Sequence, residues 1–194
     1  MPLLVSPAHP AGMLKSLRQP TIDGDGLVLR PWHASDAEVV KAAFDCPDIQ
    51  RWHARRMDSR DEALAWIEGW ESLWDDETDA SWAIAVEDRV VGQVGLRSVS
   101  LFESSAELSY WVLPAARGAG VAARAAFALT RWSFDVVGLH RIFLRHSTGN
   151  LASCRVATKL GFSDEGTQRG VLLHADGWHD AHTHARLRTD RSSL

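Results

Sequence analysis

The sequence has few cysteines, no long apolar run and no cluster of basic residues. Its two cysteines, Cys46 and Cys154, are too few for a disulfide framework and form no closely spaced zinc-type pair. No apolar stretch approaches the ~20 residues that span a bilayer. The net charge is −4 and there is no Lys/Arg-rich run, so nothing suggests a nucleic-acid partner. These absences favour a cytoplasmic enzyme or binding protein with no membrane or nucleic-acid partner.

Length and composition fit one globular domain. Hydrophobic residues account for 45% of the 194 residues and charged residues for 24%, and a chain of this length can bury a substantial core. The first 20 residues are interrupted by prolines at positions 2, 7, 10 and 20 and do not resemble a signal peptide. We therefore predict a loose leader over residues 1–20 and a single domain over residues 21–190.

One stretch, residues 106–126, carries the strongest functional signal. An apolar strand ends at Pro114, two glycines follow at Gly118 and Gly120, and apolar residues then recur at helical spacing from Val121. A strand, a glycine turn and a helix in this order direct unpaired backbone N–H groups and the positive end of the helix dipole towards an anion. The stretch lacks the Gly-Lys-Ser/Thr of a P-loop and the third glycine of the dinucleotide fingerprint.

The residues Arg117-x-x-Gly120-x-Ala122 resemble the pyrophosphate-binding motif of the GNAT superfamily of N-acetyltransferases, Gln/Arg-x-x-Gly-x-Gly/Ala. The likeness extends to the RimJ/RimL branch of that superfamily over residues 27–189. The segments that carry it are residues 27–31, 107–114, 150–153 and 159–166. The resemblance implies an α/β fold with a mixed sheet, made of antiparallel N-terminal strands and a parallel, splayed centre.

Local signals predict a compatible order of elements. Helices alternate with strands only after residue 106, which favours a mixed sheet with a parallel middle. Gly92 and Gly95 interrupt one predicted strand, where bulges or close backbone approach are expected. The predicted strands are a hairpin over 21–29, then 81–86, 89–98, 106–113, 141–146, 167–174 and 181–188. The predicted helices are 35–44, capped by Ser35-Asp36; 59–74, with a capping box from Ser59 to Glu62; 121–137; and 150–160.

The resemblance implies acetyl-CoA, or another acyl-CoA, as cosubstrate and an amine acceptor as partner. Its phosphates would meet the backbone of the turn, which comprises Arg117, Gly118, Ala119, Gly120, Val121 and Ala122. Its pantetheine arm would pair with the backbone of Trp111, Val112 and Leu113. Asn150 and Ser153 would contact the pantetheine amide and the thiol end, although an ordinary helix N-cap with a first-turn serine explains the same pair. Arg124 and Lys159 are candidates for the remaining phosphate.

Acyl transfer to an amine needs a base for the amine, donors for the developing oxyanion and a proton for the departing thiolate. Glu107 is the candidate base, because a carboxylate is unusual in an apolar strand; a structural pair with an arginine such as Arg97 is the alternative. The backbone N–H of Val112 or a neighbour is the candidate oxyanion donor. Ser153 is the candidate acid, with Tyr110 in reserve.

One departure from the family leaves the base open. Some RimL-like members carry a glutamate in the strand after the Gly-Phe motif, whereas residues 170–174 here contain no carboxylate. Either Glu107 takes that role, or His174 does, or the amine arrives neutral.

Two further residue groups draw attention. His174, His179, His182 and His184 crowd the C-terminal end, but no cysteine or carboxylate stands at a recognised ligand spacing, so surface histidines and no metal are predicted. Trp70, Trp74 and Trp82 fall where acceptor-binding elements lie in the family, so one or two of them are candidates for lining an acceptor pocket.

The combined prediction is an N-acyltransferase that moves an acetyl group to a primary amine by direct attack in a ternary complex. The amine is a protein N-terminus, a lysine or a small molecule, and a homodimer is an option. No cysteine stands where an acyl-enzyme would need one. Two alternatives stay open: an N-succinyltransferase, which needs a cation at the acyl end of the slot, and a non-catalytic acyl-CoA-binding member of the family.

Overall fold

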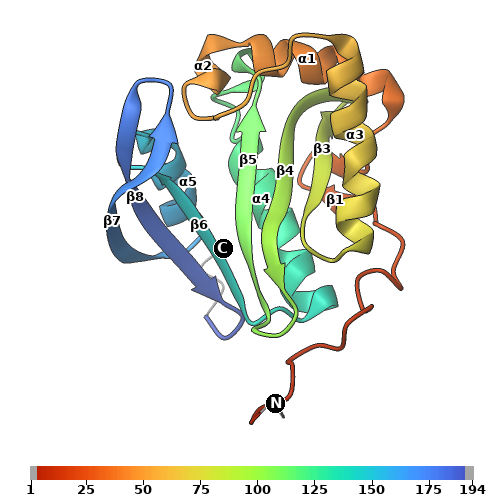
Figure 1. Ribbon diagram of the computed structural model, residues 1–194, viewed down its shortest axis with the longest axis vertical. Coiled ribbons are helices and arrows are strands. Elements are labelled where there is room, and N and C mark those ends of the chain that lie inside the picture. The colour runs from red at the N-terminus through yellow and green to blue at the C-terminus, as the bar shows by residue number, and fades with distance from the viewer. Residues whose placement is uncertain (1–3, 191–194) are drawn as a thin grey trace.

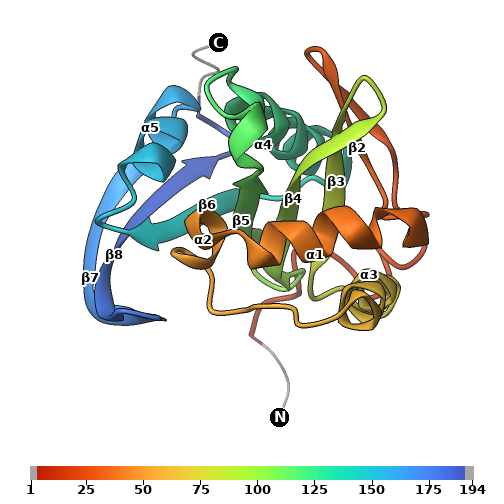
Figure 2. The same cartoon turned by 90° about the horizontal axis from the view of Figure 1, so that it is seen from above.

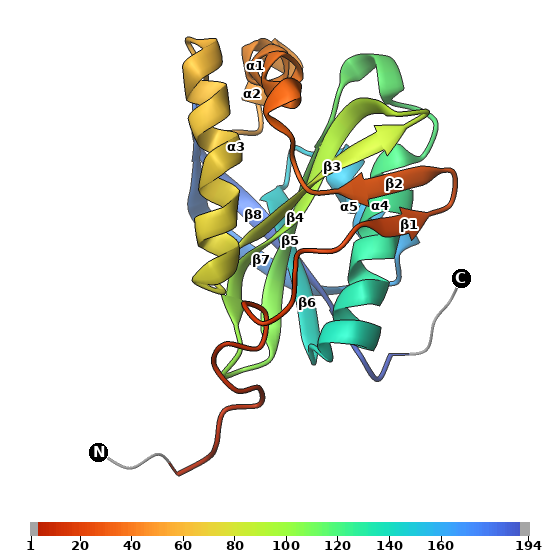
Figure 3. The same ribbon diagram turned by 90° about the vertical axis from the view of Figure 1, so that its right-hand side faces the viewer.

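The computed structural model describes residues 4–190, in which an eight-stranded sheet carries helices on both faces (Figures 1 and 3). The strand order is β1-β2-β3-β4-β5-β6-β8-β7, and within the described chain only β5 and β6 pair in parallel. This is the mixed α/β fold with a parallel centre that was predicted. The strands are β1 (Ile22–Gly24), β2 (Leu27–Arg30), β3 (Ala80–Val86), β4 (Arg89–Ser100), β5 (Ser105–Val112), β6 (Arg141–Ser147), β7 (Ser163–His174) and β8 (Gly177–Leu187).

The helices divide between the two faces of the sheet (Figure 3). One face is covered by α4 (Val121–Trp132), whose Ala125, Ala126 and Leu129 are fully buried against the sheet. Figure 2 shows α5 (Leu151–Lys159) beside β6, β8 and β7. The other face is covered by α1 (Ala37–Asp45), α2 (Pro47–Gln50) and α3 (Arg60–Asp75). Each face therefore has its own apolar cluster.

One helix end agrees with its predicted signal and another agrees in part, because only half of the predicted capping box of α3 forms. Ser59 accepts a hydrogen bond from the backbone N–H of Glu62 at 3.1 Å and caps α3, while the Glu62 carboxylate accepts from Asp58 rather than from Ser59. After α4, a π-helical turn over Ser133–Val137 ends at Gly138, whose φ of 80° is the left-handed conformation that glycine favours.

The predicted cap of α1 is correct in position but not in its bonding. Asp36 occupies the N-cap position, but its side chain makes no cap hydrogen bond, and a short 3₁₀ turn over Ala34–Asp36 precedes the helix. The carboxylate of Asp36 instead receives two hydrogen bonds from Arg30 of β2, at 2.7 and 2.9 Å, and one from the backbone N–H of His33. These donors lower the pKa of Asp36 against the opposing effect of burial, which is the largest single influence on it. A bidentate guanidinium is a stronger partner than a helix end.

Close backbone approach explains two glycines of β4, as predicted. A Cβ on Gly92 would lie 2.5 Å from the carbonyl oxygen of Trp111, and one on Gly95 would collide with the carbonyl oxygen of Ala80. The register of β3 and β4 also shifts next to Gly92. Larger residues would push β4 away from its neighbours and misplace β5.

The leader predicted over residues 1–20 packs against the domain in its described part. The backbone N–H groups of Ala8 and His9 donate to carbonyls of the β4–β5 turn, and those of Gly12 and Leu14 donate to the carboxylate of Glu77. Leu14 is 3% exposed. No helix within residues 4–190 is both long and apolar enough to cross a membrane.

Candidate functional site

The glycine turn between β5 and α4 has the geometry of an anion site. Gly118 and Gly120 have φ of 85° and 72°, and Gly120 caps α4 without any side-chain hydrogen bond. A Cβ on either glycine would meet nothing within 4 Å, so the conformation, and not crowding, requires glycine here. Along α4, the backbone N–H of Arg124 is the first with a backbone acceptor among residues 4–190, the carbonyl oxygen of Gly120. The N–H groups of residues 121–123 are therefore free to bind an anion.

Arg117 braces this turn with its side chain. Its Nε donates to the carbonyl oxygen of Val112 at 3.1 Å, and its Nη1 donates to Asp48 of α2 at 2.8 Å. The guanidinium therefore ties the end of β5 to α2. An anion in the turn would meet the backbone rather than a free arginine head.

The strands β5 and β6 diverge after a short paired stretch, as Figure 1 shows. They pair in parallel only from Ser105 to Glu107 on β5 and from Arg141 to Phe143 on β6. Beyond this point β5 stays paired with β4, and β6 stays paired with β8. The predicted splayed centre is thus present, and it leaves one edge of β5 without a strand partner.

Backbone alternation shows which predicted residues of β5 face this opening. The N–H of Leu113 donates to Val91 of β4 at 2.9 Å, so it points away from the opening. Successive residues of a strand direct their backbone groups to opposite sides. The N–H groups of Val112 and Tyr110 therefore face the opening, whereas that of Trp111 faces β4. Of the three residues predicted to pair with pantetheine, Val112 is the one so placed.

Two hollows meet in the opening. One, of about 210 Å³, lies towards Arg117 and Ala122 of the turn. The other, of about 230 Å³, lies towards Glu107 and Arg145. The residues that line both are Trp52, His53, Tyr110, Asn150 and Ser153. The slot between β5 and β6 thus connects the anion turn with a second chamber.

Asn150, Ser153 and Tyr110 gather at the junction of the two hollows. The Oδ1 of Asn150 accepts from the backbone N–H of Ser153 at 3.1 Å, so the N-cap interpretation is correct and leaves the amide nitrogen available. Burial raises the pKa of Tyr110 to about 12, an effect that the adjacent Ser153 hydroxyl partly offsets. Among residues 4–190 the Ser153 hydroxyl is a polar neighbour of the phenol oxygen, but no hydrogen bond of good geometry joins the two. The phenol is protonated at neutral pH.

Glu107 is paired with a different arginine from the one considered. Arg145 of β6 donates to both carboxylate oxygens, from Nε at 3.1 Å and from Nη2 at 3.0 Å. Arg97 lies opposite Glu107 in the β4–β5 register, but its Nε donates to Ser109 and its guanidinium stacks on Trp70 at 4.3 Å. Burial lowers the pKa of Arg97 to about 10. The parallel pairing of β5 and β6 brings Arg145 next to Glu107. The two residues are far apart in the sequence, so this ion pair could not be predicted from it.

None of the three candidate tryptophans lines the slot. Trp74 and Trp82 lie in the core and donate to the carbonyls of Leu17 and Pro20, and Trp70 packs under Arg97. Trp70 and Trp74 line a separate hollow of about 670 Å³ beside α3. Trp52 does line the slot, beside His53. Burial lowers the pKa of His53 to about 4, with the positive charge of Arg97 as the next cause. Trp52 and His53 lie in an irregular segment after α2. Such a segment has no hydrophobic periodicity, so the sequence did not indicate that they line a site.

The histidine expectation also needs correction. His184 is 3% exposed and His182 half-buried, because β8 lies between β6 and β7 with α5 beside it. His174, the alternative base, lines the second chamber, and burial lowers its pKa. His179 lies 4.6 Å from His174, ring to ring, and bonds Ser147 at 2.8 Å.

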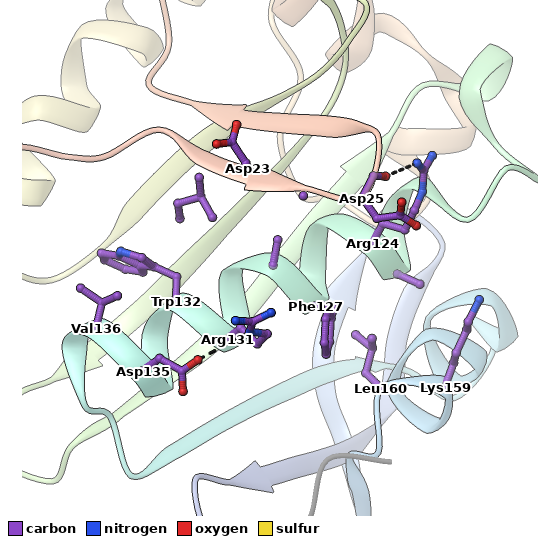
Figure 4. A pocket seen from close by; sticks show the side chains of 14 residues that line it. Asp23, Asp25, Arg124, Phe127, Arg131, Trp132, Asp135, Val136, Lys159 and Leu160 are labelled. Atoms are coloured by element: carbon purple, nitrogen blue, oxygen red, sulfur yellow. Dashed lines mark hydrogen bonds and ion pairs between the residues drawn. The ribbon is translucent and has the colours of Figure 1, made fainter. Parts of the chain in front are cut away.

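A separate groove of about 650 Å³ lies along the outer side of α4, between the β1–β2 turn and α5 (Figure 4). Arg124, whose guanidinium donates to the backbone oxygen of Asp25, and Lys159 both line it. None of its lining residues belongs to β5 or β6. It contains the two cations considered for the remaining phosphate but no candidate for acyl transfer.

Comparison with known proteins finds similar sequences over most of the chain. The sequence pattern of the acetyltransferase (GNAT) domain matches residues 26–163. The chain is 26% identical over 172 residues to an uncharacterized N-acetyltransferase, YoaA, of Bacillus subtilis, covering 87% of this chain and 97% of that protein. It is 26% identical over 101 residues to the ribosomal-protein-serine acetyltransferase of Escherichia coli, covering 52% of this chain and 56% of that protein.

Among solved structures, a RimL ribosomal-protein alpha-N-acetyltransferase in complex with coenzyme A superposes with a TM-score of 0.82. The sequence identity is 18%, over 87% of this chain and 98% of that chain. At this identity the likeness shows the fold alone.

Proposed function

The chain belongs to the GNAT acetyltransferase family, and we propose that it transfers the acetyl group of acetyl-CoA to the α-amine of a polypeptide. The arrangement of β5 carries this proposal. Side chains alternate along a strand, so Glu107 and Tyr110 lie on opposite faces of β5. Tyr110 packs against the apolar cluster on the face of the sheet that α4 covers, while Glu107 faces Arg145 on the other side. A proton donor and a proton acceptor therefore flank one slot.

The chamber on the Glu107 side supports a polypeptide acceptor. It continues across the Glu107–Arg145 pair into an open groove of about 550 Å³, which both residues also line. An extended chain terminus fits such a path, whereas a small amine needs only the inner chamber of about 230 Å³. Sequence relatives named for ribosomal-protein acetylation also favour a polypeptide acceptor.

In this proposal the chain's own groups divide the work. The turn residues 118–122 hold the coenzyme A phosphates through backbone N–H groups, whereas the N–H of Arg117 already donates to Pro114. The N–H of Val112 stabilises the oxyanion that develops on the thioester carbonyl. Glu107 removes a proton from the amine, directly or through water, and Tyr110 or Ser153 protonates the departing thiolate. Asn150 binds the pantetheine amide.

One observation favours a second donor, succinyl-CoA. A terminal carboxylate on the acyl group needs a cation at the acyl end of the slot, and Arg97 and Arg145 both line the chamber there. Both carboxylate oxygens of Glu107 engage Arg145, whereas Arg97 has only a long ion pair to Asp79, at 4.0 Å, so Arg97 is the less tightly paired cation.

The test is a matrix of two donors and four acceptors, read by free thiol release and by the mass of the product. The donors are acetyl-CoA and succinyl-CoA. The acceptors are peptides with a free N-terminus, the same peptides N-acetylated, N-acetylated peptides containing lysine, and small amines. We expect turnover with acetyl-CoA and free N-termini only. Turnover with lysine or small amines alone would contradict the polypeptide α-amine, and binding without any turnover would identify a non-catalytic member.

A further inference from the structure

Four potential metal ligands that are scattered in the sequence converge beneath α5. They are His146, Cys154, His182 and His184, and one ligand atom from each lies within 4.8 Å of all the others. His146 and His184 are buried, and the other two are half-buried. The ring centroids of the three histidines are 5.2 to 5.8 Å apart.

The fold explains why these side chains meet. His146 of β6 lies directly opposite His182 of β8 in the antiparallel register, so both project from the same face. His184 is two residues further along β8 and shares that face. Cys154 comes from α5, which packs on β6. Three elements therefore supply one ligand set, which explains why sequence spacing gave no sign of it.

The ring nitrogens of this cluster are poised for a cation. Nε2 of His146, Nδ1 of His182 and both ring nitrogens of His184 are buried and have no hydrogen-bond partner within the described chain. Nδ1 of His146 lies 2.8 Å from the carbonyl oxygen of Ser147. A carbonyl only accepts, so Nδ1 carries the proton and Nε2 keeps its lone pair. A metal-bound histidine commonly shows this second hydrogen bond.

We propose that His146, Cys154, His182 and His184 bind one Zn²⁺ ion in a closed tetrahedral site. Zinc prefers imidazole nitrogen and thiolate sulfur, at about 2.0–2.1 and 2.3 Å. Ligand atoms of such a tetrahedron lie about 3.5 Å apart, so small side-chain rotations suffice to close the cluster.

Four protein ligands leave no position for substrate, so the role is structural. The ion would fasten α5 to β6 and β8. The same helix presents Asn150 and Ser153 to the slot, so the site would fix the position of the cofactor-contacting end of α5. This proposal replaces the prediction, made from the sequence spacing of the histidines, that the chain binds no metal.

The experiment uses the full chain without a polyhistidine tag, stripped with a chelator and then titrated with ZnCl₂ or CoCl₂. We expect one zinc per chain by elemental analysis after gel filtration. We also expect tetrahedral cobalt absorption in the visible range, with a thiolate-to-cobalt charge-transfer band in the near ultraviolet. Bound zinc should slow alkylation of Cys154 but not of Cys46.

Matched variants assign the ligands. Cys154→Ser should abolish the charge-transfer band and weaken zinc binding by about 100-fold or more, and His182→Gln should weaken zinc binding similarly. Cys46→Ser and His33→Gln, a thiol and an exposed histidine outside the cluster, should behave as wild type. Cys154 and His182 are half-buried, so we expect both variants to fold, and circular dichroism checks this. Zinc binding that is absent in the wild type, or unchanged in Cys154→Ser, would overturn the proposal.

Discussion

The Glu107 carboxylate receives two hydrogen bonds from Arg145, at 3.1 and 3.0 Å, across the point where β5 and β6 separate. Glu107 belongs to the last parallel pair of the two strands, and Arg145 is the second residue beyond its partner Phe143. The ion pair therefore lies at the narrow end of the slot, between the second chamber and the open groove. The Glu107 side chain is only 16% exposed, and its carboxylate lines the second chamber. The two bonds from Arg145 hold the carboxylate in that position.

Glu107→Gln tests the general base. The substitution keeps the shape and one acceptor oxygen for Arg145 but removes the basicity. An α-amine with a pKa near 8 is largely protonated at pH 7, so kcat should fall by about 100-fold and the acidic limb of the pH–rate profile should disappear. Calorimetry should show nearly unchanged coenzyme A affinity.

Arg145→Gln is the partner control for that experiment. It removes the cation and leaves the Glu107 carboxylate in the chamber. If Glu107 is the base, this variant retains more activity than Glu107→Gln. Equal losses in both variants would show that the pair matters as a strand clamp, and the base must then be sought at His174 or in solvent.

Tyr110→Phe tests the proton donor. Burial raises the pKa of Tyr110 to about 12, so the phenol remains protonated throughout the working pH range. The variant should lower kcat by about 100-fold with little change in KM, since the phenyl ring fills the same space. Ser153→Ala is run beside it. A larger loss in Ser153→Ala than in Tyr110→Phe would assign the acid to the serine.

Gly120→Glu tests the anion turn. A Cβ at this position meets nothing within 4 Å, so the variant should fold with only the backbone strain of a positive φ, about 1–2 kcal/mol. The added carboxylate opposes the phosphates, and coenzyme A binding should be lost in calorimetry. Gly166→Glu is the control, because Gly166 also has a positive φ and open space. Normal affinity in Gly120→Glu would disprove the site.

His53 should make stability depend on pH. Burial lowers its folded-state pKa from 6.5 to about 4, so the unfolded chain binds the proton more tightly. The stabilising effect is complete above pH 6.5 and is lost as the pH falls towards 4. This residue should cost the wild type about 2 kcal/mol between pH 7 and pH 5. Urea unfolding at both pH values measures the loss.

His53→Gln should show a correspondingly smaller loss of stability over the same pH range. The control is His33→Gln, because His33 is exposed. A pH dependence in His53→Gln as steep as that of the wild type would mean that other groups cause it.

Local sequence signals were sufficient wherever the physics is local. Glycine at a positive φ, the Ser59 cap of α3 and the hydrophobic periodicity of α4 each act within a few residues, and each was predicted correctly. Asp36 shows the limit of such signals. A capping residue next to a helix was recruited by Arg30 of a neighbouring strand, because a guanidinium offers two charge-assisted bonds.

The sequence by itself determined the fold family, the glycine turn before α4 and the strand that bears Glu107 and Tyr110, since contiguous patterns encode them. Only the tertiary structure decided which side chains meet. The parallel pairing of β5 and β6 brings Arg145 to Glu107 across 38 positions of sequence. The antiparallel pairing of β6 and β8, with α5 alongside, gathers His146, Cys154, His182 and His184. Contacts of this kind depend on register and packing between distant elements, and no spacing along one chain segment records them.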